Sequence, residues 1–219
     1  MKLRIIWLAG IWLAMATMPA TAQELYDNGP INGHTDSWVI NFGYLVGDTF
    51  TVASNSVVGG FSFGAWEYPG DILSSVDWSI TSQAFGGTVY GSGTASGNNL
   101  TDKFISANAY GFDVHEITVT GLDVNAASGT TYWLNLQNAM VPDGDPVFWD
   151  ENSGIGCGGD DGKGGSCPSQ ASDSLVGTIP SESFTINGSG TGTVPEPDSL
   201  ILLASGALGV LGVLRRKLL

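Results

Sequence analysis

Apolar and polar residues alternate along several short segments in the middle of the chain. In residues 38–42, 76–80 and 132–136 every second residue is large and apolar, namely Trp38, Ile40, Phe42, Val76, Trp78, Ile80, Tyr132, Leu134 and Leu136. Residues 48–52 and 183–186 repeat the pattern. A repeat of two residues indicates β-strands with one buried face. No segment of this region shows a convincing helical period.

The phase of the pattern changes after Tyr110. Apolar residues occupy even positions up to Val114 and odd positions from Ile117 onwards. One extra residue in the strand would restore the facing of the side chains, so the sequence predicts a β-bulge near His115 and Glu116.

Turn-forming residues separate these segments at short intervals. They include Gly59-Gly60, Pro69-Gly70-Asp71, Gly86-Gly87, Gly97-Asn98-Asn99, Ser128-Gly129 and Pro142-Asp143-Gly144-Asp145. Strands that follow one another without intervening helices favour an antiparallel β-sandwich or jelly roll. We therefore expect a single all-β domain over residues 23–186.

The N-terminus has the pattern of a secretory signal peptide. Lys2 and Arg4 precede an apolar stretch, and Ala20 and Ala22 form a small-residue cleavage site. This order predicts a helical signal peptide over residues 1–22 with cleavage after Ala22. The alternative is a buried N-terminal helix.

The C-terminus combines four segments in a fixed order. A linker of small residues, 187–194, precedes Pro195-Glu196-Pro197, an uncharged stretch over 200–214, and the cations Arg215, Arg216 and Lys217. A helix of this length reaches about 22 Å, against roughly 30 Å of hydrocarbon, so a short transmembrane helix is feasible when flanking cations snorkel. The basic cluster should stay cytoplasmic, with the rest of the chain across the membrane.

These C-terminal residues resemble the PEP-CTERM sorting tail of Gram-negative bacteria, also catalogued as the ice-binding protein C-terminal domain. The resemblance covers residues 195–219 and implies recognition near Pro195, Glu196 and Pro197 by an exosortase, a membrane-embedded cysteine protease and transpeptidase. It further implies a single-pass inner-membrane intermediate and a mature protein on the cell surface or outside the cell. The alternative is a plain membrane anchor that is never cut.

The charge of the exported region limits its partners. Residues 23–194 hold 19 of the 21 acidic residues and only two cations, Lys103 and Lys163, so their formal charge is −17. Such a region repels phosphate backbones, which excludes nucleic-acid binding.

Cys157 and Cys167 are the only cysteines. Two thiols in an exported region predict a disulfide. A zinc site is the alternative, but it needs further ligands, and His34 and His115 are the only histidines.

Acidic residues gather in the loop-rich last third of the body. Calcium prefers six to eight oxygen ligands, which flexible acidic loops can supply. Possible ligands are Asp143, Asp145, Asp150, Asp160 and Asp161, although none fits an EF-hand. The alternative is a set of solvated acidic loops. No other cofactor is expected.

Catalytic signatures are weak. We expect His34 and His115 to be ordinary surface or strand residues. The sequence neither identifies nor excludes a carboxylate pair for glycoside hydrolysis, because the two members of such a pair are distant in sequence and meet only in the fold.

Three aromatic residues flank turns where a ring could stack on a sugar. They are Trp66, Tyr68 and Trp149, and packing against the turns is the alternative. We expect an exosortase-sorted surface or matrix protein without enzymatic activity, associated with exopolysaccharide. The alternatives are a carbohydrate-binding module and a jelly-roll glycoside hydrolase or lyase.

Overall fold

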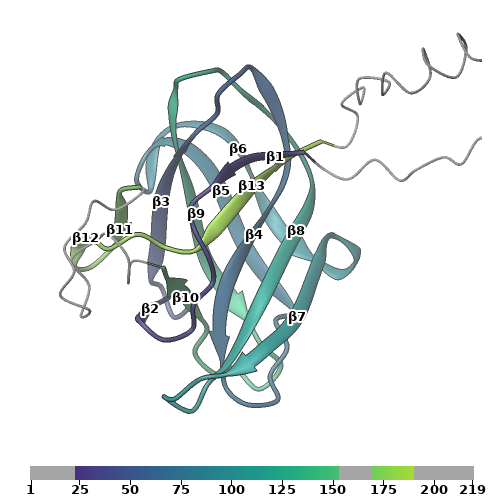
Figure 1. Ribbon diagram of the computed structural model, residues 1–219, viewed down its shortest axis with the longest axis vertical. Helices are drawn as coiled ribbons and strands as arrows, with labels where there is room; N and C mark the ends of the chain where they lie inside the picture. Colours follow the sequence, from purple (N-terminus) through teal and green to yellow (C-terminus); the bar gives the residue numbers. More distant parts are fainter. Residues whose placement is uncertain (1–22, 153–168, 190–219) are drawn as a thin grey trace, which may run out of the picture.

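The computed structural model describes residues 23–152 and 169–189, which form thirteen strands and one short 3-10 turn, η1 (Gly97–Asn99) (Figure 1). The strands are β1 (Glu24–Asp27), β2 (Asp36–Val39), β3 (Leu45–Thr51), β4 (Ser56–Glu67), β5 (Ser75–Gln83), β6 (Gly86–Ser96), β7 (Leu100–Ala107), β8 (Asp113–Ala126), β9 (Thr131–Met140), β10 (Phe148–Glu151), β11 (Ala171–Asp173), β12 (Gly177–Ile179) and β13 (Phe184–Gly188). The described residues contain no α-helix, which confirms the expected all-β class.

The strands form two antiparallel sheets. The first has the order β1-β13-β4-β10-β2, with β8 also paired to β4 and β7 paired to β8. The second has the order β12-β11-β3-β9-β5-β6. Strand β4 organises the first sheet, because β8 lies along one edge of it while β13 and β10 share the other edge.

One hydrophobic core lies between the sheets. Phe61 of β4 meets Trp78 of β5 with ring centroids 6.3 Å apart, and Tyr26 of β1 meets Phe50 of β3 at 6.2 Å. Burying one such phenylalanine contributes about 1.5–3 kcal/mol. Because both sheets contribute side chains to the same core, the arrangement is sandwich-like.

The alternation predicted for residues 76–80 and 132–136 is confirmed, since these segments lie in β5 and β9 and their apolar side chains pack into the core. The prediction is wrong for Phe42. Strand β2 ends at Val39, and the chain turns before β3, so Phe42 has φ 55° and is 64% exposed.

The predicted bulge at His115 and Glu116 is misplaced. Strand β8 pairs with β4 without interruption at these residues, and the irregularity lies in β7, between Phe104 and Ser106. The apolar positions change from even to odd because both faces of β8 are covered near Val114 and His115. Val114 packs beneath Gly33 on one face, while His115 is buried on the other.

The domain extends slightly further than the sequence predicts. Asn187 and Gly188 belong to β13 rather than to a linker, and the Ser189 backbone N–H donates to Val57 O at 2.9 Å. The predicted signal peptide (1–22), the disulfide between Cys157 and Cys167, and the tail beyond residue 189 lie outside the described residues.

In the ranges 23–152 and 169–189, no helix is long and apolar enough to cross a membrane.

Candidate functional site

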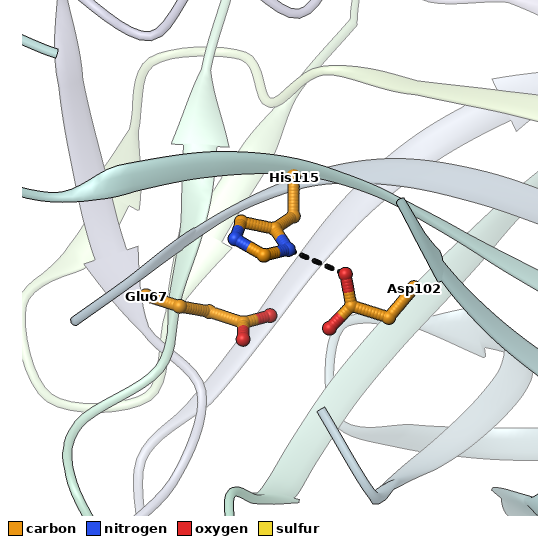
Figure 2. Close-up of side chains that lie close together, drawn as sticks. All are labelled: Glu67, Asp102 and His115. Atoms are coloured by element: carbon orange, nitrogen blue, oxygen red, sulfur yellow. Dashed lines mark hydrogen bonds and ion pairs between the residues drawn. The ribbon is translucent and has the colours of Figure 1, made fainter. Parts of the chain in front are cut away.

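Three ionisable side chains converge at the end of the first sheet where β4 finishes (Figure 2). Glu67 is the last residue of β4, Asp102 lies in β7 and His115 lies in β8. The strand period places Glu67 in phase with Phe63 and Ala65, on the face that points into the sandwich. We call Glu67, Asp102 and His115 the inner cluster.

A hydrogen bond joins two members of the inner cluster. Nδ1 of His115 lies 2.5 Å from Oδ1 of Asp102, and Oδ2 of Asp102 accepts the backbone N–H of Leu73 at 2.6 Å. The Phe104 ring meets the imidazole edge-on, with centroids 5.7 Å apart. These contacts fix the orientation of the His115 ring.

The remaining polar atoms of the inner cluster have no hydrogen-bond partner among the described residues. Glu67 is 0% exposed, and neither of its carboxyl oxygens has a donor among the described residues, although the Asp102 carboxyl lies close enough to share a proton with it. Nε2 of His115 is also buried and unpaired. Buried polar atoms without protein partners are rare in proteins, and such atoms often bind a water or an ion.

The electrostatics of the inner cluster follow from this burial. Desolvation raises the pKa of Glu67 to about 8, and the nearby Asp102 charge adds to the effect. Desolvation alone would lower the pKa of His115, but the hydrogen bond to Asp102 and the charge of Glu67 outweigh it and raise the pKa. The imidazole therefore holds its proton more tightly than a free histidine.

A second group of carboxylates, the outer cluster, consists of Asp71, Asp143 and Asp145. One carboxyl oxygen of each lies within 4.8 Å of one from each of the others. Asp71 follows β4, and the other two lie in the loop after β9. Desolvation and the neighbouring Asp143 charge raise the pKa of Asp71.

The outer cluster contains two of the five predicted calcium ligands, Asp143 and Asp145. Asp150 lies elsewhere, so its assignment to the same site is wrong. Its buried carboxylate accepts the backbone N–H groups of Asn32 and Gly33, Trp66 Nε1 and Ser183 Oγ. Asp160 and Asp161 lie outside the described residues.

A further buried network surrounds Asp48 at the other side of the core. Its carboxylate accepts Asn28 Nδ2 at 3.1 Å and the backbone N–H groups of Thr49 and Glu182. Burial raises the pKa of Asp48 to about 6. Both carboxyl oxygens of Glu182 are buried and unpaired within the described part of the chain, and burial raises the pKa of Glu182 well above its usual range.

The predicted sugar-stacking aromatics are only partly exposed. Trp149 is 0% exposed and donates Nε1–H to Ser183 O, so its expected role as a stacking surface is wrong. Trp66 is buried beneath Tyr110, with centroids 5.5 Å apart. Tyr68 is exposed, and so is Tyr110, which the sequence did not single out.

The two histidines differ. His34 is exposed, as expected for a surface residue, and its Nδ1 lies 2.7 Å from Asn32 Oδ1. His115 is a strand residue, but a buried one whose neighbours Glu67 and Asp102 were not identified from the sequence. The sequence signal that could have identified them is their place in the apolar–polar alternation, because Glu67 and His115 occupy positions where the alternation predicts core residues.

Comparison with known proteins identifies the C-terminal segment. The family model described as the PEP-CTERM protein-sorting motif matches residues 193–217. The chain therefore carries a PEP-CTERM protein-sorting motif, as the resemblance predicted, and this supports export and sorting by an exosortase. No curated protein sequence matches the chain.

Proposed function

We propose that this chain is the precursor of a surface or matrix protein without enzymatic activity, whose β-domain is displayed outside the cell. The PEP-CTERM match over residues 193–217 is the observation that supports the export and sorting of the chain. It begins only five residues after β13 ends at Gly188, so the sorting signal follows the folded domain almost directly.

The sorting route follows from the chemistry of the tail. The exosortase recognises Pro195, Glu196 and Pro197 while the uncharged stretch 200–214 holds the chain in the inner membrane. The cations that follow this stretch stay on the cytoplasmic side, because moving them through the hydrocarbon is costly.

Exosortase deletion should change the mass of the protein in its native host. In the presence of exosortase, we expect intact-mass spectrometry to report a species that has lost both the signal peptide and the residues after the cut near Glu196. Without exosortase, the tail should remain and the protein should fractionate with the inner membrane.

Two substitutions sharpen this test. Glu196→Ala should keep the tail, as in the deletion strain, while Ser199→Ala, just outside the tripeptide, should be processed normally. Identical masses in strains with and without exosortase would show that the tail is an uncut anchor.

We further propose that the displayed domain associates with exopolysaccharide. The exposed residues Tyr68 and Tyr110 belong to one cluster of aromatic rings. Trp66 and Phe112 connect them, with ring centroids 5.0–5.9 Å apart. Exposed rings of this kind can stack on sugar faces.

Affinity electrophoresis through host exopolysaccharide tests this association. We expect the exported protein to be retarded, and Tyr68→Ala with Tyr110→Ala to weaken binding by about 2–10-fold, the loss of one or two stacking contacts. Phe42→Ala, which removes an exposed ring in a different turn, is the matched control. Equal mobility of all three proteins with and without polysaccharide would contradict the proposal.

A further inference from the structure

We propose that Glu67, Asp102 and His115 form a binding site for one divalent transition-metal ion of the zinc class. The proposal is independent of the sorting route, because it concerns side chains inside the folded domain. It accounts for the atoms of the inner cluster that the protein itself leaves without partners.

The first argument is the concentration of unpaired buried atoms. Within the described residues, both Glu67 oxygens and His115 Nε2 have no hydrogen-bond donor other than a proton that Glu67 could share with the Asp102 carboxyl, and Glu67 is 0% exposed. A buried carboxylate is costly unless it is paired or coordinates a metal. A divalent cation would neutralise the charges of Glu67 and Asp102 together and supply the missing partner.

The second argument is distance. One ligand atom from each of Glu67, Asp102 and His115 lies within 4.8 Å of one from each of the others. Zinc binds nitrogen and carboxylate oxygen at about 2.0–2.2 Å, so two ligands on opposite sides of one ion are at most about 4.4 Å apart. The side chains therefore need to move only slightly to share an ion.

The third argument is the choice of ligand atoms. An imidazole with two carboxylates suits zinc and related ions, whereas calcium takes oxygen ligands. The outer cluster of Asp71, Asp143 and Asp145 offers oxygen alone. The imidazole of His115 therefore gives the inner cluster a preference for zinc that an all-oxygen group such as the outer cluster does not have.

The surroundings of the inner cluster also suit a metal site. The Asp102–His115 hydrogen bond holds the imidazole in place before an ion binds, and Asp102 must release it to become a ligand. Among the described strands, β7 pairs with β8 alone, so Asp102 lies on an edge strand that can shift to admit an ion without disturbing β4.

The competing explanation is a cluster held together by shared protons without an ion. Zinc titration of the full exported chain distinguishes the two. The chain should carry no polyhistidine tag, keep its tail in a host without exosortase, and be purified in detergent and stripped with EDTA. We expect calorimetry with zinc chloride to show one bound ion. At 100-fold excess of free zinc over Kd, the Tm should rise by about 5–10 °C.

Substitutions locate the site. Glu67→Gln and Asp102→Asn should each weaken zinc binding at least tenfold. Glu182→Gln is the matched control, because it also neutralises a buried carboxyl group with unpaired oxygens, and it should bind zinc normally. Asp143→Asn with Asp145→Asn, and Cys157→Ser with Cys167→Ser, should also leave the affinity unchanged.

Zinc-edge X-ray absorption of the unmodified chain gives a result that does not depend on the folding of any variant. We expect one imidazole and oxygen ligands in the metal shell, with no sulfur. The proposal is overturned if the folded chain binds no zinc, if the shell contains sulfur or lacks imidazole, or if Glu67→Gln binds as tightly as the unmodified chain.

Discussion

Replacing Asp150 with alanine is expected to lower the free energy of unfolding by about 3–5 kcal/mol, among the largest effects of any single substitution in this domain. Its carboxylate accepts hydrogen bonds from Asn32, Gly33, Trp66 and Ser183. Alanine leaves these donors without an acceptor. Each unpaired buried donor costs about 1–3 kcal/mol, and the costs add only in part because the donors share one site.

Urea unfolding followed by tryptophan fluorescence measures the effect. Asp143→Ala is the control, because it removes an exposed aspartate and should change the free energy by about 0.5 kcal/mol or less. If both variants unfold at the same urea concentration, Asp150 does not stabilise the fold through these contacts. The loss of unfolding free energy in Asp150→Ala should be the same with and without calcium, because the Asp150 carboxylate contacts only protein groups.

Glu182→Gln should stabilise the domain at neutral pH by about 1 kcal/mol or more, because each unit by which burial raises a carboxyl pKa costs about 1.4 kcal/mol once the pH exceeds it. Glu182 is 0% exposed, and the negative charges of Asp48, Glu151 and Asp150 add to the burial that raises its pKa. Folding therefore shifts Glu182 toward its protonated form, at a cost in stability near neutral pH that a neutral glutamine does not carry.

The same substitution should flatten the pH dependence of stability. A carboxyl group whose folded pKa is raised contributes its full stability below its unfolded pKa of 4.5 and loses it as the pH rises toward the folded pKa. Asp48 adds a similar loss between its ordinary pKa of 3.8 and its raised pKa of about 6. The unmodified domain should therefore become less stable from pH 4 to pH 7.

Thermal unfolding at several pH values tests this expectation. The advantage of Glu182→Gln should vanish near pH 4, where the glutamate is protonated in both the folded and the unfolded chain. Ser172→Ala, which removes a hydroxyl that donates to the backbone oxygen of Gly177, should leave the slope with pH unaltered. A constant difference between Glu182→Gln and the unmodified chain at every pH would exclude titration of Glu182 as the cause.

The alternation of apolar and polar residues was sufficient to predict the strands that have one solvent-exposed face and one buried face. Tyr132 is in the core and Trp78 packs against it, because the period of two places both on the inner side. Phe42 fits the same pattern but is exposed, since a turn interrupts the strand before it. Local alternation cannot show where a ladder of hydrogen bonds ends.

The candidate site was harder to predict because its members come from three strands. Glu67 and Asp102 are 35 positions apart in the chain, and only the pairing of β4 with β8 and of β8 with β7 brings both to His115. Asp150 shows the opposite error. It lies among acidic loop residues in the sequence, yet the fold turns its carboxylate inward, where backbone and side-chain donors surround it.

The position of β13 determines how the domain bears a mechanical load. This strand is hydrogen-bonded along one edge to β1 and along the other to β4, and its last residue, Gly188, precedes the C-terminal tail in the chain. A pull on the C-terminal end therefore shears two ladders simultaneously instead of peeling one edge strand away. Drag on a tethered copy would be spread over many backbone hydrogen bonds before the domain could open.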